Sequence, residues 1–174
     1  WKILGAVLKL RGKINESLVA FKKSVQLDPQ DASTHYNLGI ILNELGRLEE
    51  AETSYKKAIT LKPDYAKAHN NLAVLLQDVG RLEEAEVSFR QAITLKPDYA
   101  EAYYNLGIML KELDRLEEAE ASYNKAITLK PDYSDAHNNL GNFLIDKGES
   151  LAAIDSYKKA IKIKPDFVSA WHNI

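Results

Sequence analysis

Histidines and adjacent glutamates are the residues of this chain whose types and spacing could perform chemistry. His35, His69 and His137 carry imidazole nitrogens, which bind zinc and exchange protons near neutral pH. Three pairs could act as general acid and base: Glu49-Glu50, Glu83-Glu84 and Glu117-Glu118. Both sets recur at intervals of 34 residues or twice that number, so the elements that position them must themselves repeat.

All five prolines of the chain share this interval: they are Pro29, Pro63, Pro97, Pro131 and Pro165. Proline removes a backbone donor and ends a helix, so evenly spaced prolines mark evenly spaced joints. Repeats of about 20 to 50 residues are typical of solenoids, in which each repeat buries its apolar side only against its neighbours. The chain is therefore predicted to be a tandem array rather than a globular domain with a deep pocket.

The 34-residue spacing predicts that residues 1–174 form a single array of repeats. It predicts a partial first repeat over 1–31, four full repeats at 32–65, 66–99, 100–133 and 134–167, and the start of a further repeat at 168–174. Because both ends fall inside repeats, we expect the chain to be a fragment of a longer protein.

Each repeat is predicted to contain two antiparallel helices, as repeat 66–99 illustrates. Asp64 follows a proline and could cap the first helix, since its carboxylate can accept from unpaired backbone amides. Gly80 suits the left-handed residue that closes this helix, and a second helix is expected from near Leu82 until Pro97 stops it.

The repeat argues against the chemistry that the histidines and glutamates suggested. Equivalent residues of successive repeats stand about 10 Å or more apart, too far to share a metal ion with bonds near 2 Å. The histidines occupy a bulky packing position, and the glutamate pairs recur where second helices begin, next to the positive end of the helix dipole. We predict no catalytic residues, no metal site, no cofactor and no enzyme activity.

Composition narrows the class of partner. A formal net charge of -2 argues against nucleic acid, which requires a basic stripe. No apolar run approaches the roughly 20 residues that span a bilayer, so no membrane segment is expected. The chain has no cysteine, which excludes disulfides and thiolate metal sites. A cytoplasmic location is predicted, although targeting signals could lie outside this segment.

The repeat resembles the tetratricopeptide repeat (TPR) along the whole chain. The TPR pattern consists, in order, of a bulky residue, Leu, a small residue, a second bulky residue, Ala, an aromatic residue, Ala and Pro. In repeat 32–65 these eight positions hold His35, Leu38, Gly39, Leu42, Ala51, Tyr55, Ala58 and Pro63. Departures are mild, since Ala73 replaces this glycine and Asp114 replaces a turn glycine. The resemblance implies an all-α, right-handed superhelical solenoid of antiparallel helix pairs, whose first helices line a concave groove that binds an extended peptide or a partner helix.

One asparagine recurs just before the Leu and small-residue pair, at a position that the resemblance places in the groove. This asparagine ladder consists of Asn37, Asn71, Asn105, Asn139 and Asn173. A side-chain amide both donates and accepts, so the ladder could hold the backbone of an extended peptide independently of its sequence. Alternatively, these residues hold adjacent first helices together.

Other expected groove residues fall into three rows along the first helices. The first alternates between aromatic and amide, the second is mainly aliphatic and the third is acidic: Tyr36, Asn70, Tyr104 and Asn138; Ile40, Val74, Ile108 and Asn142; Glu44, Asp78, Glu112 and Asp146. Such a surface would favour a neutral or basic peptide, with Lys67 and Lys111 offsetting part of the acidity. Alternatively, the carboxylates form a solvated helix edge.

The expected groove residues distinguish between two subclasses of TPR domain. Domains that hold the acidic ends of chaperones use basic groove residues, whereas Arg47, Arg81 and Arg115 are expected in the turns. The asparagine ladder is more similar to the recognition arm of O-linked N-acetylglucosamine transferase. The chain is thus predicted to be a protein-interaction module, with a substrate-recognition arm of a larger enzyme as an alternative.

A structural scaffold is a further alternative. Solenoids normally end in a cap with a polar outer face, whereas here the ends carry Trp1, Phe167 and Trp171. These apolar residues could stack molecules head to tail, or flanking protein could cover them.

Overall fold

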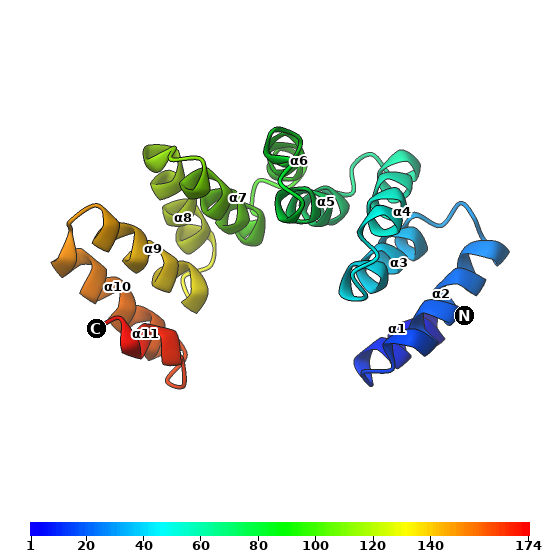
Figure 1. Ribbon diagram of the computed structural model, residues 1–174, viewed down its shortest axis with the longest axis horizontal. Helices are drawn as coiled ribbons and strands as arrows, with labels where there is room; N and C mark the ends of the chain where they lie inside the picture. The colour runs from blue at the N-terminus through cyan, green and yellow to red at the C-terminus, as the bar shows by residue number, and fades with distance from the viewer. The chain divides into compact units, whose positions relative to one another are not determined.

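The computed structural model describes residues 1–174 and contains α-helices without any strand (Figure 1). The helices are α1 (Lys2–Leu10), α2 (Ile14–Leu27), α3 (Ala32–Glu44), α4 (Leu48–Leu61), α5 (Ala66–Asp78), α6 (Leu82–Leu95), α7 (Ala100–Glu112), α8 (Leu116–Leu129), α9 (Ser134–Asp146), α10 (Ser150–Ile163) and α11 (Val168–His172). None of them combines the length and the apolar character that a membrane crossing requires.

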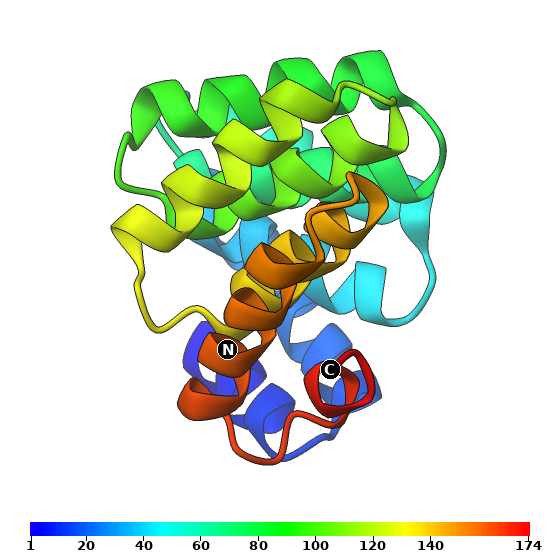
Figure 2. The same ribbon diagram turned by 90° about the vertical axis from the view of Figure 1, so that its left-hand side faces the viewer.

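The chain divides into two compact units. The first, Trp1–Leu95, contains α1 to α6, and the second, Lys96–Ile174, contains α7 to α11. Within each unit the two helices of a repeat pack against each other side by side, and the second helix also contacts the first helix of the next repeat (Figure 1, Figure 2). This arrangement confirms the predicted all-α array of antiparallel helix pairs.

The helix boundaries follow the sequence signals closely. In repeat 66–99 the second helix begins at Leu82 and ends two residues before Pro97. Gly80 has φ of +77°, the left-handed conformation that closes the first helix. The predicted cap at Asp64 is wrong: the N-cap residue of α5 is Tyr65, and no side chain caps this helix. Asp64 stands one residue too early to reach the first amides.

The two helices of a repeat meet where a residue without a side chain faces an aromatic ring. A Cβ atom built on Gly39 would lie 2.6 Å from ring carbons of Tyr55, and one on Gly107 would lie 2.9 Å from those of Tyr123. Both tyrosines are almost fully buried. In the first repeat, buried Ser17 donates to the Gly5 carbonyl at 2.8 Å, so a serine replaces alanine here without leaving an unpaired hydroxyl.

Most joints between repeats share one construction. A lysine ammonium lies over the ring of the aromatic residue three positions later, at 4.5 to 5.2 Å from the centroid. The pairs are Lys62 with Tyr65, Lys96 with Tyr99, Lys130 with Tyr133 and Lys164 with Phe167.

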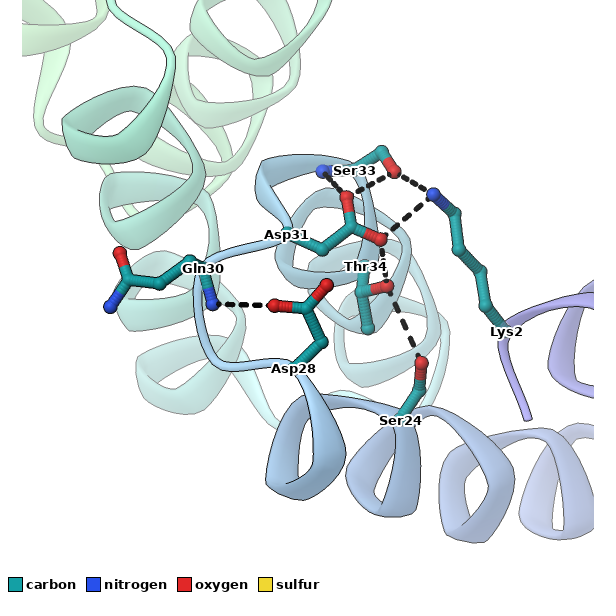
Figure 3. A network of polar contacts seen from close by, with 7 residues as sticks. All are labelled: Lys2, Ser24, Asp28, Gln30, Asp31, Ser33 and Thr34. Carbon is teal, nitrogen blue, oxygen red and sulfur yellow. Dashed lines mark hydrogen bonds and ion pairs between the residues drawn. The ribbon is translucent and has the colours of Figure 1, made fainter.

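The first joint is polar instead, because Asp31 takes the place of the aromatic residue. Its carboxylate caps α3 by accepting from the Ser33 amide at 3.0 Å, and it also accepts from the Thr34 hydroxyl at 2.6 Å (Figure 3). Lys2 of α1 donates to Asp31 at 2.8 Å and to the Ser33 hydroxyl. This network joins the first helices of two successive repeats.

The same network stabilises the ionised form of Asp31. Burial alone would raise its pKa, but hydrogen bonds from Lys2, Ser33 and Thr34 outweigh burial and hold the pKa well below its usual value of 3.8. A pKa that is lower in the folded state adds stability above the unfolded value, and that stability is lost as the pH falls through the folded value.

Substitution of Gly39 by Ala should destabilise the array. The added methyl group collides with the buried ring of Tyr55, and overpacking outweighs the gain in helix propensity, for a net loss of about 1–2 kcal/mol. The midpoint of urea unfolding, followed by circular dichroism, measures this loss. An unchanged midpoint for Gly39→Ala would contradict the packing argument.

Replacement of Asp114 by Gly should stabilise the chain. Asp114 has φ of +57°, whereas the corresponding turns contain Gly12, Gly46, Gly80 and Gly148. Relief of this backbone strain is worth about 0.5–1 kcal/mol. Thermal unfolding should therefore shift upward for Asp114→Gly and downward for the reverse control, Gly46→Asp. A lower melting temperature for Asp114→Gly would show that the aspartate side chain itself stabilises the turn.

Asp31→Ala should cost about 0.5–2 kcal/mol at neutral pH through loss of the helix cap. The difference from the natural chain should shrink as the pH falls below 3.8, because Asp31 becomes protonated first in the unfolded state and then in the folded state. Urea unfolding at several pH values measures this trend. The exposed Asp64, replaced by Asn, serves as the control that should show little effect. A pH-independent difference would exclude the ionised carboxylate as the cause.

Candidate peptide-binding site

The asparagine ladder lies on the first helices and is only partly buried. Asn37 and Asn71 lie on α3 and α5 of the first unit, Asn105 and Asn139 on α7 and α9 of the second, and all four are half-buried. Their position leaves them reachable from solvent, although contacts within the chain already occupy part of the hydrogen-bonding capacity of Asn71 and Asn139.

In the first unit Asn71 ties two first helices together. Its amide nitrogen donates to the Tyr36 hydroxyl at 3.3 Å, and its oxygen accepts from the Asn70 amide at 3.3 Å. The Tyr36 ring lies 4.9 Å from the Tyr65 ring and 6.1 Å from the Tyr55 ring, measured between centroids. Asn71 of α5 is thereby fastened to α3.

The second unit repeats this arrangement 68 residues later. Asn139 donates to the Tyr104 hydroxyl at 3.0 Å and accepts from Asn138 at 3.3 Å. The Tyr104 ring lies 4.9 Å from the Tyr133 ring and 6.3 Å from the Tyr123 ring. The alternation of tyrosine and asparagine along the sequence therefore corresponds to a hydrogen-bonded unit built from two consecutive repeats.

Asn70 and Asn138 were expected on the surface beside the ladder, and the structure corrects this. Their exposed fractions are 0% and 6%, so neither side chain can face a ligand. Instead they support the ladder from beneath by donating to Asn71 and Asn139. A buried amide needs such partners, and nothing in the sequence alone separated this role from a surface one.

The hydrogen bonds of the second unit continue to Asn142. Asn173 donates to the oxygen of Asn138 at 3.4 Å and to that of Asn142 at 3.0 Å. The Tyr157 hydroxyl donates to the same Asn142 oxygen at 2.9 Å. The Asn173 amide nitrogen is the donor of this contact, and the oxygen of Asn142 is the acceptor. Both lone pairs of this oxygen are then occupied, which leaves the two N–H groups of Asn142 for other partners.

Asn142 borders a surface hollow of about 340 Å³ in the second unit. The hollow is lined by Ile108, Lys111, Glu112, Tyr123, Asn139 and Asn142, so it brings together four of the expected groove residues. Tyr123, whose ring packs against Gly107, also lines the hollow, and burial raises the pKa of its hydroxyl, which keeps it protonated. Lys111 had been noted only for its charge.

The expected acidic edge is partly neutralised within the chain. Glu44 pairs with Lys9 at 2.7 Å, and Asp146 pairs with Lys111 at 2.6 Å. Both ion pairs join the first helices of successive repeats. The carboxylates of Asp78 and Glu112 are also exposed, on α5 and α7. The attraction for a basic peptide is therefore weaker than four free carboxylates would produce.

The aliphatic row differs between the units. Ile40 and Val74 are half-buried on α3 and α5 of the first unit, and Ile108 is half-buried on α7. Asn142 occupies the corresponding position on α9. Only the second unit therefore combines an aliphatic side chain and an amide in this row.

The histidines have a structural role at the joints. The Nε2 atoms of His35, His69 and His137 lie 3.0, 3.1 and 3.0 Å from the carbonyl oxygens of Pro29, Pro63 and Pro131. A carbonyl only accepts, so each Nε2 carries a hydrogen and cannot ligate a metal through that atom. The indole nitrogen of Trp171 donates to Pro165 in the same way, at 2.8 Å.

The second glutamate of each pair lies near a turn arginine. Arg47 binds Glu50, Arg81 binds Glu84 and Arg115 binds Glu118. In each pair the glutamate follows the arginine by three residues, about one helical turn. Hydrogen bonds from Arg47 and Arg81 lower the pKa values of Glu50 and Glu84. An ionised, arginine-bound carboxylate is poorly suited to act as a general acid.

The end residues expected to mediate association differ in exposure. Trp1 and Trp171 have exposed fractions of 56% and 58%, whereas Phe167 is half-buried beneath Lys164. Phe167 therefore serves its own joint, and head-to-tail stacking stays a prediction that rests on the two tryptophans.

Solved structures with the same fold provide a comparison, while no curated protein sequence matches significantly. A crystal structure of MamA is 27% identical, with 95% of this chain and 96% of that chain covered and a TM-score of 0.80. PilF of Pseudomonas aeruginosa is 21% identical, with coverages of 99% and 86% and a TM-score of 0.85. YrrB, described as a TPR protein with an unusual peptide-binding site, is 23% identical, with coverages of 97% and 87% and a TM-score of 0.73.

Family models account for nearly the whole sequence. A model described as "TPR repeat" matches residues 5–44 and 41–80, and two models described as "Tetratricopeptide repeat" match residues 64–132 and 134–167. None of these models describes an enzyme. The helix pairs, the repeated joints and these matches together show that the chain belongs to the tetratricopeptide repeat family.

Proposed function

We propose that the chain is a protein-interaction module that binds an extended segment of a partner protein along its first helices. The observation that carries this proposal is the hollow of the second unit, where Asn139 and Asn142 meet the aliphatic side chain of Ile108. Amide donors beside an aliphatic contact suit a peptide, which presents carbonyl oxygens and side chains at regular intervals.

The hydrogen-bonding capacity around the hollow favours acceptors on the ligand. Asn142 offers two N–H groups because its oxygen is occupied by Tyr157 and Asn173. Asn139 offers one N–H group and one lone pair after its bonds to Tyr104 and Asn138. The proposed ligand therefore places a carbonyl oxygen, from its backbone or from an Asn or Gln side chain, against Asn142.

The charges at the hollow favour an uncharged ligand group. The ammonium group of Lys111 is already paired with Asp146 at 2.6 Å. A carboxylate on the ligand would therefore lose its solvation without gaining this ammonium group as a partner. A neutral acceptor avoids this cost.

The two units differ in what they can recognise. At the position of Asn142 the first unit has Ile40 and Val74, so its surface offers aliphatic contact there instead of donors. Asn37 has no hydrogen-bond partner within the chain and could bind a peptide amide with its full capacity. The first unit by itself would thus prefer an apolar ligand segment, and the second unit by itself an acceptor-rich one.

The likeness to the recognition arm of O-linked N-acetylglucosamine transferase rests on the asparagine ladder alone. The solved structures compared above are other TPR proteins, and at 23% identity YrrB supports the fold rather than a shared ligand. A role as the substrate-recognition arm of a larger enzyme is therefore a narrower form of the same proposal.

Asn142→Asp tests the donor role of Asn142. The aspartate keeps both acceptor positions for Tyr157 and Asn173 but presents oxygen where the ligand needs N–H, so affinity should fall about tenfold or more. A peptide array selects the ligand, and fluorescence anisotropy with the best peptide measures its Kd. Asn124→Asp on exposed α8 makes the same change of charge away from the hollow and should leave the Kd unaltered.

An Asn142→Asp variant that binds with unchanged affinity, at an unchanged melting temperature, would overturn the proposed contact. Alanine at Asn71 is a poorer test, because it also removes the link between α3 and α5.

A further inference from the structure

The first unit carries a second pair of surface hollows, on the side of the second helices. The first hollow, of about 330 Å³, lies among Lys22 of α2, Leu38 and Leu42 of α3, and Glu49 and Glu50 of α4. Adding 34 to each number yields the second hollow, of about 320 Å³, among Lys56, Leu72, Leu76, Glu83 and Glu84. The two hollows are therefore copies of one surface feature, one repeat apart, and we name them the leucine slots.

The leucine slots lie apart from the asparagine ladder. Their floor is formed by Leu38 and Leu42, which are nearly buried, whereas Asn37 and Ile40 occupy other faces of the same helix. Their walls come from the second helices of successive repeats. A ligand in the slots would therefore contact other residues of the unit than those contacted by a peptide bound along the ladder.

One carboxylate in each slot is uncommitted. Glu50 and Glu84 are bound by Arg47 and Arg81 at 2.6 and 2.7 Å. Glu49 and Glu83 make no ion pair and no side-chain hydrogen bond within the chain, although each lines a slot. Glu49 also borders the adjoining hollow beside Gly46 and Arg47.

The remaining polar groups of the slots are already engaged. Lys56 binds Glu52 at 2.7 Å, and Lys22 approaches Glu50 at 3.7 Å. The Ser54 hydroxyl donates to the backbone of Glu50 at 2.8 Å. An apolar floor with one unpaired carboxylate on its rim is what remains for a partner.

Long basic side chains match this combination. The aliphatic stem of Arg or Lys covers apolar surface while its charged head stays at the rim, where a carboxylate can bind it. Val87 lines the second slot with an exposed fraction of 70% and extends its apolar contact. In repeat 100–133 the glutamate pair continues as Glu117 and Glu118, whereas repeat 134–167 has Leu151 and Ala152 in its place, so the last repeat lacks this charge.

We infer that the leucine slots form a second docking surface, for a partner segment that carries two long basic side chains among apolar residues. One basic side chain enters each slot and pairs with Glu49 or Glu83. This surface is independent of the peptide site proposed above, so the chain can hold two partners at once.

A synthetic peptide of alternating arginine and leucine tests the inference on the full chain. Alternation supplies pairs of arginines at every even spacing, on the same face of an extended peptide. Anisotropy in low salt should show saturable binding, and the Glu49→Gln, Glu83→Gln double variant should weaken it about fivefold, as expected for loss of two rim ion pairs. A peptide with citrulline in place of arginine should bind the unaltered chain with an affinity that is reduced to a similar extent.

Matched controls separate the slots from general attraction. Asp78→Asn with Glu101→Gln removes the same charge from exposed positions elsewhere and should leave the affinity within twofold, as should Asn142→Asp. Absence of saturable binding, or equal losses in the slot and control variants, overturns the inference. A large loss in Asn142→Asp also overturns it, because the peptide would then occupy the ladder side.

Discussion

The close approach of each helix pair is the constraint on which the rest of the structure depends. The ring of a second-helix tyrosine lies against the backbone of the first helix, where Gly39 or Gly107 leaves no room for a methyl group. Tyr157 of α10 occupies the same position against Gly141, and its hydroxyl reaches Asn142 beyond that glycine. One residue therefore packs the helix pair and also occupies the oxygen of Asn142, so core packing determines which atoms the candidate site presents.

The structural role of the asparagine ladder is compatible with the ligand-binding role that we propose for it. Asn71 and Asn139 fasten successive first helices through Tyr36 and Tyr104, which is a structural role. A primary amide has more donors and acceptors than these bonds consume, so the same residue can still hold a ligand. The structural contact orients the amide in advance, which lowers the entropy cost of binding.

The net charge of the whole chain is close to zero, but the unpaired charges are distributed unevenly between its surfaces. On the ladder side, Lys9 and Lys111 pair with acidic residues of the next repeat, which leaves amide donors as the main polar groups of the hollow. In the slots the turn arginines satisfy one glutamate of each pair and leave Glu49 and Glu83 unpaired. The two proposed surfaces would thus suit different partners, an acceptor-rich segment and a basic one.

The sequence by itself determined the repeat, the helix boundaries and the position of each ladder residue, because these depend on local signals. The 34-residue period placed α6 at Leu82–Leu95 and the left-handed residue at Gly80. Only the tertiary structure decided that Asn70 and Asn138 are buried, that Tyr65 rather than Asp64 precedes α5 as its cap, and that Asn142 presents donors. Each of these depends on which atoms of a neighbouring helix come within hydrogen-bonding distance, and residues far apart in sequence supply those atoms.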